Sequence, residues 1–400
     1  MNKIIIILII ATLRLWANAG VIVHNSRKEI DACKGMINLK LLRTWGGDDE
    51  KDENKFFKTP SSVAIDKNGR VYICDRHDHC IKVFSTNGGY IRTIGRRGQG
   101  PGDLLGPGRV MLAPDGDVLV LEYDGFRIQR FSPEGKSKKI MVIPRSLGWA
   151  GITSKNEIAL YSWLNTFLSK RIIAFIDAAG RTTREIGFHN DQASGYIDSE
   201  KLWIAIDDAD QFYVANAWTP VIRKYVPGGE LELAITFETP FSDQARIKLN
   251  PDKTEIEIQR TSEGPRSFVK KDRTGNAAID RSGEQRIDIF KGIAVDAGGR
   301  IYVISPRRTF LKEETAATRI SGNADGLNRS LVEPDLTKNI DVYQLLVFDN
   351  KGKIYAEAHI PGTCDDIYIH GNKLFIIDGY VNQRILEFEI NVDGGDANPK

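Results

Sequence analysis

No charge of one sign dominates this sequence. Its 400 residues carry 55 lysines and arginines against 53 acids, a formal net charge of +2. Proteins that bind nucleic acid through the phosphate backbone need a basic excess, so the composition excludes that class at the level of the whole chain. The 37 glycines and 15 prolines are an ordinary share, which excludes collagen-like and low-complexity chains.

Motifs that carry chemistry are scarce as well. The chain has six histidines, and no G-x-S-x-G nucleophile elbow or P-loop stands in a plausible context. The glycine-rich stretch Gly95–Gly102 is expected to join two strands rather than to open a helix, which argues against phosphate binding there. The sequence therefore predicts a fold and a compartment more clearly than it predicts a reaction.

The N-terminus has the three parts of a secretory signal peptide. Lys3 precedes the uncharged run Ile4–Leu13, and Ala17–Ala19 supplies a small-residue cleavage site. The run is too short to span a bilayer, and no later segment reaches that length. We expect cleavage after Ala19 and a soluble, secreted or periplasmic protein; a buried N-terminal strand is the alternative. Loss of Lys3 and Arg14 would change the net charge from +2 to zero.

One unit of short strands and polar turns recurs along the chain. In its clearest copy, Pro60–Asp75 reads as strand, turn and strand, and Cys80–Phe84 and Tyr90–Gly95 add two further strands. Each strand alternates between apolar and polar residues, and each turn carries Asn, Asp or Gly.

Two independent markers count the copies. The turn between the first two strands recurs at Asp66–Gly69, Pro114–Gly116, Ser154–Asn156, Asp207–Asp210, Asp296–Gly299 and His370–Asn372. An aromatic residue ends the third strand at Phe84, Phe131, Phe175, Tyr225, Phe348 and Phe388, and glycines follow at 88, 135, 180, 229, 352 and 394. Both markers give six. Six units of four antiparallel strands predict an all-β, six-bladed β-propeller, in which each blade buries its faces against two neighbours.

The sequence also predicts how the ring closes. The sixth unit has only three strands of its own, at Asp365–Ile369, Lys373–Asp378 and Arg384–Glu389. Leu39–Gly46 matches Tyr90–Gly95, the fourth strand of the first unit. We therefore expect the N-terminal strand to complete the last blade and to leave no open edge.

These residues resemble the NHL-repeat family, and more closely the secreted six-bladed propellers of bacteria built on it. Pro60–Phe84 has the pattern of a whole unit, and Arg127–Phe131 and Asn382–Phe388 repeat its second half. The resemblance covers residues 37–390, after a signal peptide at 1–19 and a lead-in at 20–36, and leaves a tail at 391–400. It implies the fold but not the function, because propellers serve as binding modules and as enzymes.

Function is expected on one face of the propeller. We call this face the top: it carries the connections from each fourth strand to the next first strand and the turns between second and third strands. Two long insertions reach it, at 238–286 and 306–341. They flank the same blade and could meet as a lid, since long loops in compact domains are usually functional or disordered.

Candidate ligand-binding residues fall at the channel mouth and on the top turns. The starts of first strands supply Ser62, Arg109, Lys291 and Asp366, with Lys201 and Asp365 beside them. Their mixed charge would suit a small polar or anionic ligand; a water-filled funnel of solvated charges is the alternative. The top turns supply Tyr123, Trp163, Trp218 and Tyr380. Such rings suit sugars or proteins, since a ring gives much contact area at low entropic cost, unless each packs against a neighbouring blade.

Two enzyme classes were compared with these positions. The peptide-amidating lyase resembles this fold and holds zinc through histidines at the starts of first strands, but the matching positions are Ser61-Ser62, Lys291-Gly292 and Asp365-Asp366, so that site is rejected. We read His77-Asp78-His79 as a polar hairpin tip. Gluconolactonase-like propellers bind a divalent ion through acids and an amide, and Asp198, Glu200, Asp365 and Asp366 could supply carboxylates.

We therefore expect a monomeric binding scaffold without a cofactor, which recognises a glycan, a peptide or an envelope protein through its top face. A metal-dependent lactonase or lyase at the top of the channel is the alternative, and only there is a divalent metal implied. Nucleic acid and a membrane span are not expected.

One position of the repeat carries an arginine in three units, at Arg127, Arg171 and Arg384. We expect each of these arginines to bond a neighbouring strand end, which is Asp378 in the case of Arg384.

Four cysteines remain after processing, and three pairings are possible. Cys74 ends one strand of a hairpin and Cys80 begins the next, so a strained disulfide between them is one expectation. The alternative is two small buried thiols.

Overall fold

The structure is a computed structural model, and it describes residues 20–143, 147–162, 173–177, 180–186, 202–217, 219–240, 246–249, 256–259, 268–271, 277–280, 284–285, 289–321, 328–335, 338 and 340–392. The expected signal peptide, Trp163, Arg171, Trp218 and the end of the C-terminal tail lie outside these residues.

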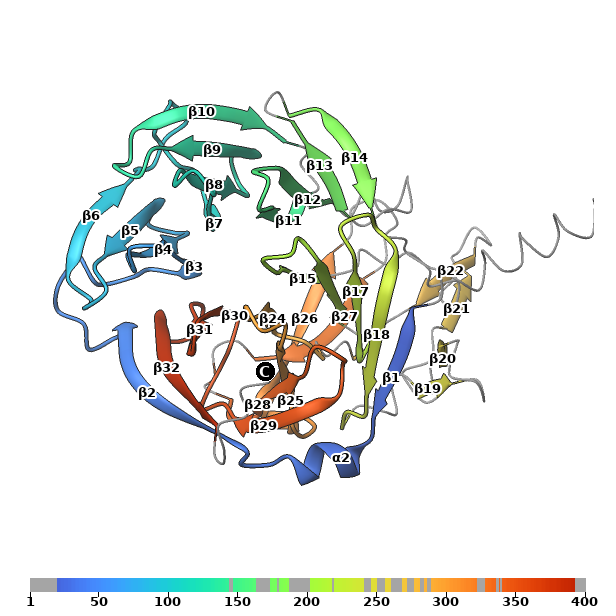
Figure 1. The fold of residues 1–400 in the computed structure, drawn as a ribbon. Helices are drawn as coiled ribbons and strands as arrows, with labels where there is room; N and C mark the ends of the chain where they lie inside the picture. The colour runs from blue at the N-terminus through green and yellow to red at the C-terminus, as the bar shows by residue number, and fades with distance from the viewer. Residues whose placement is uncertain are drawn as a thin grey trace, which may run out of the picture.

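Six four-stranded antiparallel sheets stand around a central channel, as Figure 1 shows. Blade one is β3 (Pro60–Ile65), β4 (Val71–Asp75), β5 (Cys80–Phe84) and β6 (Tyr90–Ile94). Blade two is β7 (Pro107–Leu112), β8 (Val118–Glu122), β9 (Arg127–Phe131) and β10 (Ser137–Val142). Blade three is β11 (Leu147–Ile152), β12 (Ile158–Ser162), β13 (Ile173–Ile176) and β14 (Thr182–Ile186).

The other three blades follow in chain order. Blade four is β15 (Leu202–Ile206), β16 (Phe212–Asn216), β17 (Val221–Tyr225) and β18 (Leu231–Phe237). Blade five is β24 (Gly292–Val295), β25 (Ile301–Pro306), β28 (Tyr343–Phe348) and β29 (Ile354–His359). Blade six is β30 (Asp366–His370), β31 (Lys373–Asp378), β32 (Arg384–Val392) and β2 (Ile37–Gly46). The predicted all-β, six-bladed propeller is confirmed.

The aromatic residue and the glycine that mark the third strand of the repeat each have a structural role. Phe84 and Phe348 are fully buried at the ends of third strands, and Phe84 packs edge-on against Trp45 at a centroid distance of 5.2 Å. The following glycines turn the chain with positive φ, 82° at Gly88 and 83° at Gly352, which L-residues with a side chain rarely adopt. In blades one and five, the aromatic ring thus packs in a gap between neighbouring blades, and the chain reverses direction at the glycine that follows.

The core is divided by the blades. Among the described residues, six hydrophobic clusters form, one between each pair of neighbouring blades around the ring. The second strands β4, β8, β16 and β25 are buried along their whole length. Each blade therefore depends on two neighbours for its burial, as expected of a radial repeat.

The N-terminal strand closes the ring as predicted. β2 pairs antiparallel with β32 over nine positions, from Ile37 opposite Val392 to Gly46 opposite Arg384. Trp45 is 4% exposed, and its indole Nε1 donates to Glu387 Oε2 at 3.1 Å. The outer strand of blade six therefore comes from the opposite end of the chain.

The chain before β2 also belongs to the propeller, which was not predicted. We call residues 20–46 the strap: they comprise β1 (Val21–Asn25), the helix α2 (Arg27–Ala32) and β2. β1 pairs parallel with β18 as a fifth strand of blade four. α2 begins with a capping box between Ser26 and Glu29, and the Gly35 N–H then donates to Glu357 O at 3.3 Å. The strap thus runs along the outer edges of blades four, five and six (Figure 1).

Short strands form in both insertions. The first contains the hairpins β19 (Arg246–Leu249) with β20 (Ile256–Gln259) and β21 (Phe268–Lys271) with β22 (Ala277–Asp280), then β23 (Glu284–Gln285). The second contains the short helix η1 (Lys312–Glu314) and the hairpin β26 (Thr315–Ser321) with β27 (Asn328–Pro334). β23 pairs parallel with β27, so the two insertions contact each other. Over the described part of the chain, no helix has the length and apolar character needed to cross a membrane.

Candidate functional site

A cavity of about 340 Å³ lies at the mouth of the central channel. Every blade contributes to its wall: side chains include Ser61, Arg76, Arg109, Tyr123, Trp149, Trp203, Lys291, Asp365, Asp366 and Tyr380. The first strand of a blade lies nearest to the axis, and the turns between second and third strands open on the same face. The geometry of the repeat therefore brings residues from distant parts of the chain to one point.

Most of the predicted ligand-binding residues within the described ranges line this cavity. Arg109, Tyr123, Lys291, Asp366 and Tyr380 are all part of its wall. Trp163 and Trp218 lie outside the described residues.

Ser62 is not part of the wall. It is 6% exposed, and its hydroxyl accepts the Val110 N–H at 3.3 Å, which ties blade one to blade two. Side chains alternate along a strand, so the neighbouring Ser61 faces the cavity in its place.

Arg109 is fixed from two sides. Its guanidinium lies over the Trp149 ring, with Cζ 5.2 Å from the ring centroid, and Nη1 lies 3.9 Å from Asp366 Oδ2. A guanidinium held over an aromatic face loses few conformations when it binds a ligand. The cation is thus presented to the cavity in one position.

Arg76 forms a second such group. Its Cζ lies 5.6 Å from the centroid of the Tyr123 ring, Nη1 donates to the Tyr380 hydroxyl at 3.4 Å, and Nη2 lies 3.3 Å from Asp124 Oδ1. Tyr123 in turn donates to Gly148 O at 3.3 Å, and burial raises its pKa. Three blades are linked through this cluster, because Tyr380 belongs to blade six and Tyr123 to blade two.

Carboxylates balance these cations. Asp365 Oδ2 accepts the N–H groups of Gly379 at 2.8 Å and Tyr380 at 3.0 Å. Burial nevertheless raises the pKa of Asp365, against the effect of those two bonds and of Lys291. Lys291 itself is 8% exposed. The cavity wall therefore offers acidic and basic side chains that are largely shielded from water.

Trp149 leaves a donor unused. The ring is 5% exposed, and its Nε1 is buried without a hydrogen-bond acceptor among the described residues. A buried N–H without a partner costs free energy. A ligand oxygen in the cavity would remove that cost.

Sequence reasoning missed three wall residues or gave them no role. Arg76 directly follows the buried Asp75 at a strand end, so its place in the repeat was a usable signal. Trp149 lies in β11, the first strand of blade three, so its place in the repeat was a usable signal as well. Trp203 lies within the inner strand β15, where a large ring is expected in the core, so no signal separated it from a packing residue.

Two of the three recurring arginines, Arg127 and Arg384, are structural, as predicted. Arg127 Nε donates to Glu122 Oε1 at 2.8 Å, and Arg384 Nε donates to Asp378 Oδ2 at 3.1 Å. Both link the end of a second strand to the start of the third.

The histidines of the blade-one hairpin also bond within the fold: His77 Nδ1 lies 2.6 Å from Thr59 Oγ1, and His79 Nδ1 accepts the Gly106 N–H at 3.0 Å.

The expected Cys74–Cys80 disulfide is wrong, because the strand register separates the two sulfurs. Cys74 lies opposite Ile81, and Cys80 lies opposite Asp75. Residues one step apart in register project from opposite faces of a sheet. Both are buried free thiols, and burial raises the pKa of Cys80 to about 12.

Metal binding was considered for the enzyme alternative. Where the structure describes the chain, no three His, Cys, Asp or Glu side chains come together in an arrangement suited to a metal ion. Asp198 and Glu200 lie outside the described residues.

Comparison with known proteins agrees with this architecture. The NHL repeat pattern matches residues 57–84, which span the first three strands of blade one. The chain is thus a six-bladed β-propeller that carries an NHL repeat. No curated protein matches it by sequence.

Solved structures include several of similar shape. A Bacteroides fragilis protein, named as an exported protein, gives a TM-score of 0.54 at 11% identity, over 93% of this chain and 100% of that one. Virginiamycin B lyase of Staphylococcus aureus gives 0.46 at 12% identity, over 88% and 99%. A gluconolactonase of Xanthomonas campestris gives 0.44 at 10% identity, over 84% and 87%. At 11% identity, the first likeness shows a shared fold and nothing further.

Proposed function

We propose that this chain is a secreted or periplasmic binding scaffold, and that it holds a charged peptide segment of a partner protein at the channel mouth. The observation that carries the proposal is the convergence of charges of both signs, from blades one, two, five and six, on one cavity of about 340 Å³. Cavities of this size with a few convergent polar groups are typical binding sites.

A peptide fits this wall better than a glycan does. Glycan recognition uses the open faces of aromatic rings, but Arg109 lies over Trp149 and Arg76 lies over Tyr123. The wall also carries charged groups of both signs, with Arg76, Arg109 and Lys291 against Asp365 and Asp366. A peptide segment carries carboxylates, ammonium groups and backbone amides, and so can meet both signs at once.

Selection from a displayed peptide library tests this proposal. The probe is the tightest peptide selected by the mature chain, and its affinity is measured by calorimetry. We expect Arg109→Gln and Tyr380→Ala each to weaken binding by roughly tenfold or more, as hot-spot residues do. Tyr380 is 52% exposed, so its truncation should leave the fold intact.

Arg181→Ala is the matched control. Its side chain is 80% exposed and pairs with Asp177 on a turn of blade three, away from the cavity wall. No enrichment of any peptide, or equal affinity of the selected peptide for all three variants, would refute the proposal.

The metal-dependent alternative is tested on the same preparation. Asp365 is committed to two backbone N–H groups, which makes it a poor ligand for a cation in this arrangement. Elemental analysis of protein purified without chelator should give no stoichiometric divalent ion. One ion per chain would favour a lactonase or lyase instead.

The proposed compartment is tested by N-terminal sequencing of the mature protein. β1 begins at Val21, so cleavage after Ala19 would leave the strap whole. We expect the sequence to start at Gly20 in a secreted or periplasmic fraction. A start at Met1 in the cytoplasmic fraction would exclude the signal peptide.

A further inference from the structure

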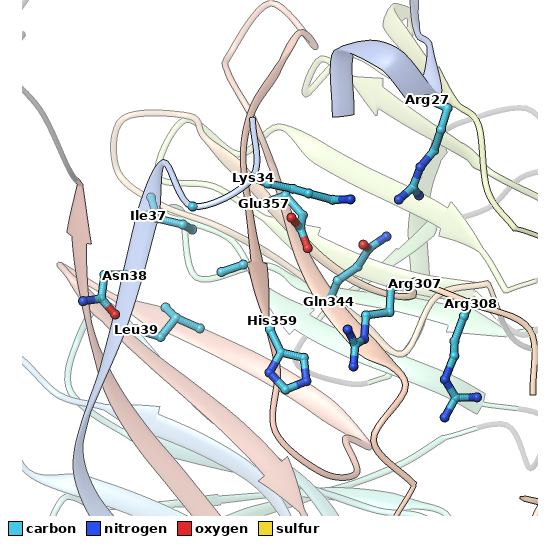
Figure 2. Close-up of a pocket in the computed structure, with 12 residues that line it drawn as sticks. Arg27, Lys34, Ile37, Asn38, Leu39, Arg307, Arg308, Gln344, Glu357 and His359 are labelled. Atoms are coloured by element: carbon cyan, nitrogen blue, oxygen red, sulfur yellow. The ribbon is translucent and has the colours of Figure 1, made fainter. Parts of the chain in front are cut away.

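A second and larger cavity, of about 670 Å³, lies at the outer rim of blade five. Three segments distant in sequence enclose it: the strap, the root of the second insertion, and strands β28 and β29. Its wall includes Arg27, Lys34, Ile37, Asn38, Leu39, Arg307, Arg308, Gln344, Glu357, Ala358 and His359. We call it the rim pocket. Figure 2 shows Arg27, Lys34, Gln344 and Glu357 pointing toward one another across it.

Carboxylates behind the wall hold the basic groups of the rim pocket in place. Asp31 Oδ1 lies 2.9 Å from Arg27 Nη2 and 2.8 Å from Lys34 Nζ. Arg308 makes two bonds of 2.7 Å to Glu314, and Asp341 lies 3.4 Å from Arg307 Nη2 and 2.6 Å from His359 Nε2. The pairs fix the geometry, and the cations keep further N–H groups that these carboxylates do not use.

The second set of groups in the rim pocket consists of acceptors. Gln344 is 2% exposed, and Glu357 is 7% exposed. Gln344 lies opposite His359 in the register of β28 and β29, so Gln344, Glu357 and His359 share one face of blade five. Burial raises the pKa of Glu357, against the opposing effect of Lys34, Arg27 and Arg307.

Two polar atoms here are left without partners among the described residues. Arg27 Nη1 is a buried donor with no acceptor, and Gln344 Oε1 is a buried acceptor with no donor. Each buried polar atom without a partner costs about 1–3 kcal/mol, so native structures rarely keep two in one cavity without a reason. A ligand that brings both an acceptor and a donor would satisfy both.

We propose that the rim pocket binds a small hydroxylated organic anion of the sugar-acid class. Its carboxylate accepts from Arg27 Nη1 and Lys34, and its hydroxyl groups donate to Gln344 Oε1 and to the Glu357 carboxylate. Ile37, Leu39 and Ala358 also line the cavity, but Ala358 alternates with Glu357 and His359 along β29 and packs with Ile37 in the core between blades five and six, so recognition rests on the polar groups. A cavity of about 670 Å³ lies within the usual range for sites of small molecules. This site is separate from the channel mouth and does not depend on the function proposed there.

Calorimetric titration of the mature chain tests the proposal, with D-glucuronate as the probe and D-glucose and inorganic phosphate as comparisons. We expect saturable binding of glucuronate and at least tenfold weaker binding of the other two, because glucose lacks the anion and phosphate lacks the hydroxyl groups in a ring. If glucose binds as tightly as glucuronate, the anionic group is not recognised. If phosphate binds as tightly, the hydroxyl groups are not recognised. Either result overturns the proposal. So does the absence of glucuronate binding.

Two variants locate the site. Gln344→Met removes the buried acceptor at similar volume and should weaken glucuronate binding by roughly tenfold, while the free protein melts at the same temperature or higher. Lys34→Gln should also weaken binding, and its side chain is 53% exposed, so the fold should not suffer. Arg181→Ala, on an exposed turn of blade three outside both cavities, is the control and should bind glucuronate normally. If Gln344→Met lowers the melting temperature and leaves affinity unchanged, the amide is structural and the proposal fails.

Discussion

At the scale of single residues, one hydrogen-bonded turn is used again and again in this propeller. Asp207 Oδ1 accepts the N–H groups of Ala209 at 3.0 Å and Gln211 at 2.9 Å, and Oδ2 accepts the Tyr213 hydroxyl at 3.0 Å. Asp66 with Tyr72 and Asp296 with Tyr302 repeat the arrangement in blades one and five. The carboxylate thus replaces the backbone acceptors that a tight turn lacks.

Asp207→Ala should therefore destabilise the fold by about 2–3 kcal/mol, because it removes three hydrogen bonds of roughly 1 kcal/mol each. Tyr213→Phe removes one of them and should cost about 1 kcal/mol. Urea denaturation measures both. If the two variants are equally stable, the backbone bonds to Asp207 contribute nothing.

Glu357 gives the protein a predictable response to pH. Burial raises its pKa, so the folded state prefers the protonated carboxyl and loses stability as pH rises through the folded pKa. Glu357→Gln keeps a neutral group at every pH. The variant should be more stable than the wild type at pH 7, and the difference should shrink as pH falls through the raised folded pKa toward the ordinary glutamate pKa of about 4.3.

Urea denaturation between acid and neutral pH measures that difference. A stability difference between Glu357→Gln and wild type that stays constant with pH would contradict the expected ionisation of Glu357.

At the scale of elements, one buried side chain of the strap, Asn25, joins two blades. Asn25 is fully buried. Its Nδ2 donates to Gly352 O at 2.9 Å, and its Oδ1 accepts the Ile354 N–H at 2.8 Å. This one side chain joins β1, at the edge of blade four, to the last turn of blade five.

Asn25→Ala should cost about 2–3 kcal/mol, since it removes two bonds and leaves two buried backbone groups without partners. Ser26→Ala, next to it, removes only the helix cap of α2 and should cost about 1 kcal/mol. Thermal melts of the two variants compare them directly. A larger loss for Ser26→Ala would mean that the helix, and not Asn25, holds the strap.

The elements differ in how far the sequence predicts them. Blade strands such as Val71–Asp75 combine alternating apolar residues with Asn, Asp or Gly in the adjoining turns. Both signals can be read from residues next to one another in the sequence. β1 and α2 depend on partners such as Thr236 and Gly352, more than two hundred residues away, which no local pattern reveals. The channel mouth was largely predicted because the repeat sets its positions. The rim pocket was not, since it combines three segments of unrelated sequence.

At the scale of the whole molecule, stability should depend on closure. Deleting residues 20–46 removes β1, α2 and β2 and exposes the edges of blades four and six. We expect this deletion to lower the melting temperature far more than trimming residues 394–400 does, because each blade relies on its neighbours for burial. Scanning calorimetry of the two truncated proteins measures the difference. Equal melting temperatures would show that closure is dispensable.

The pairing of Ile37 with Val392 also sets the order of events in biosynthesis. β2 leaves the ribosome early, but it is an outer strand whose partner β32 is made last. Until then its backbone N–H and C=O groups are available to any other extended chain, and contacts so distant in sequence form slowly. A propeller closed in this way is therefore most vulnerable to aggregation while it is being made, and its growing chain is a natural client for chaperones until β32 has emerged.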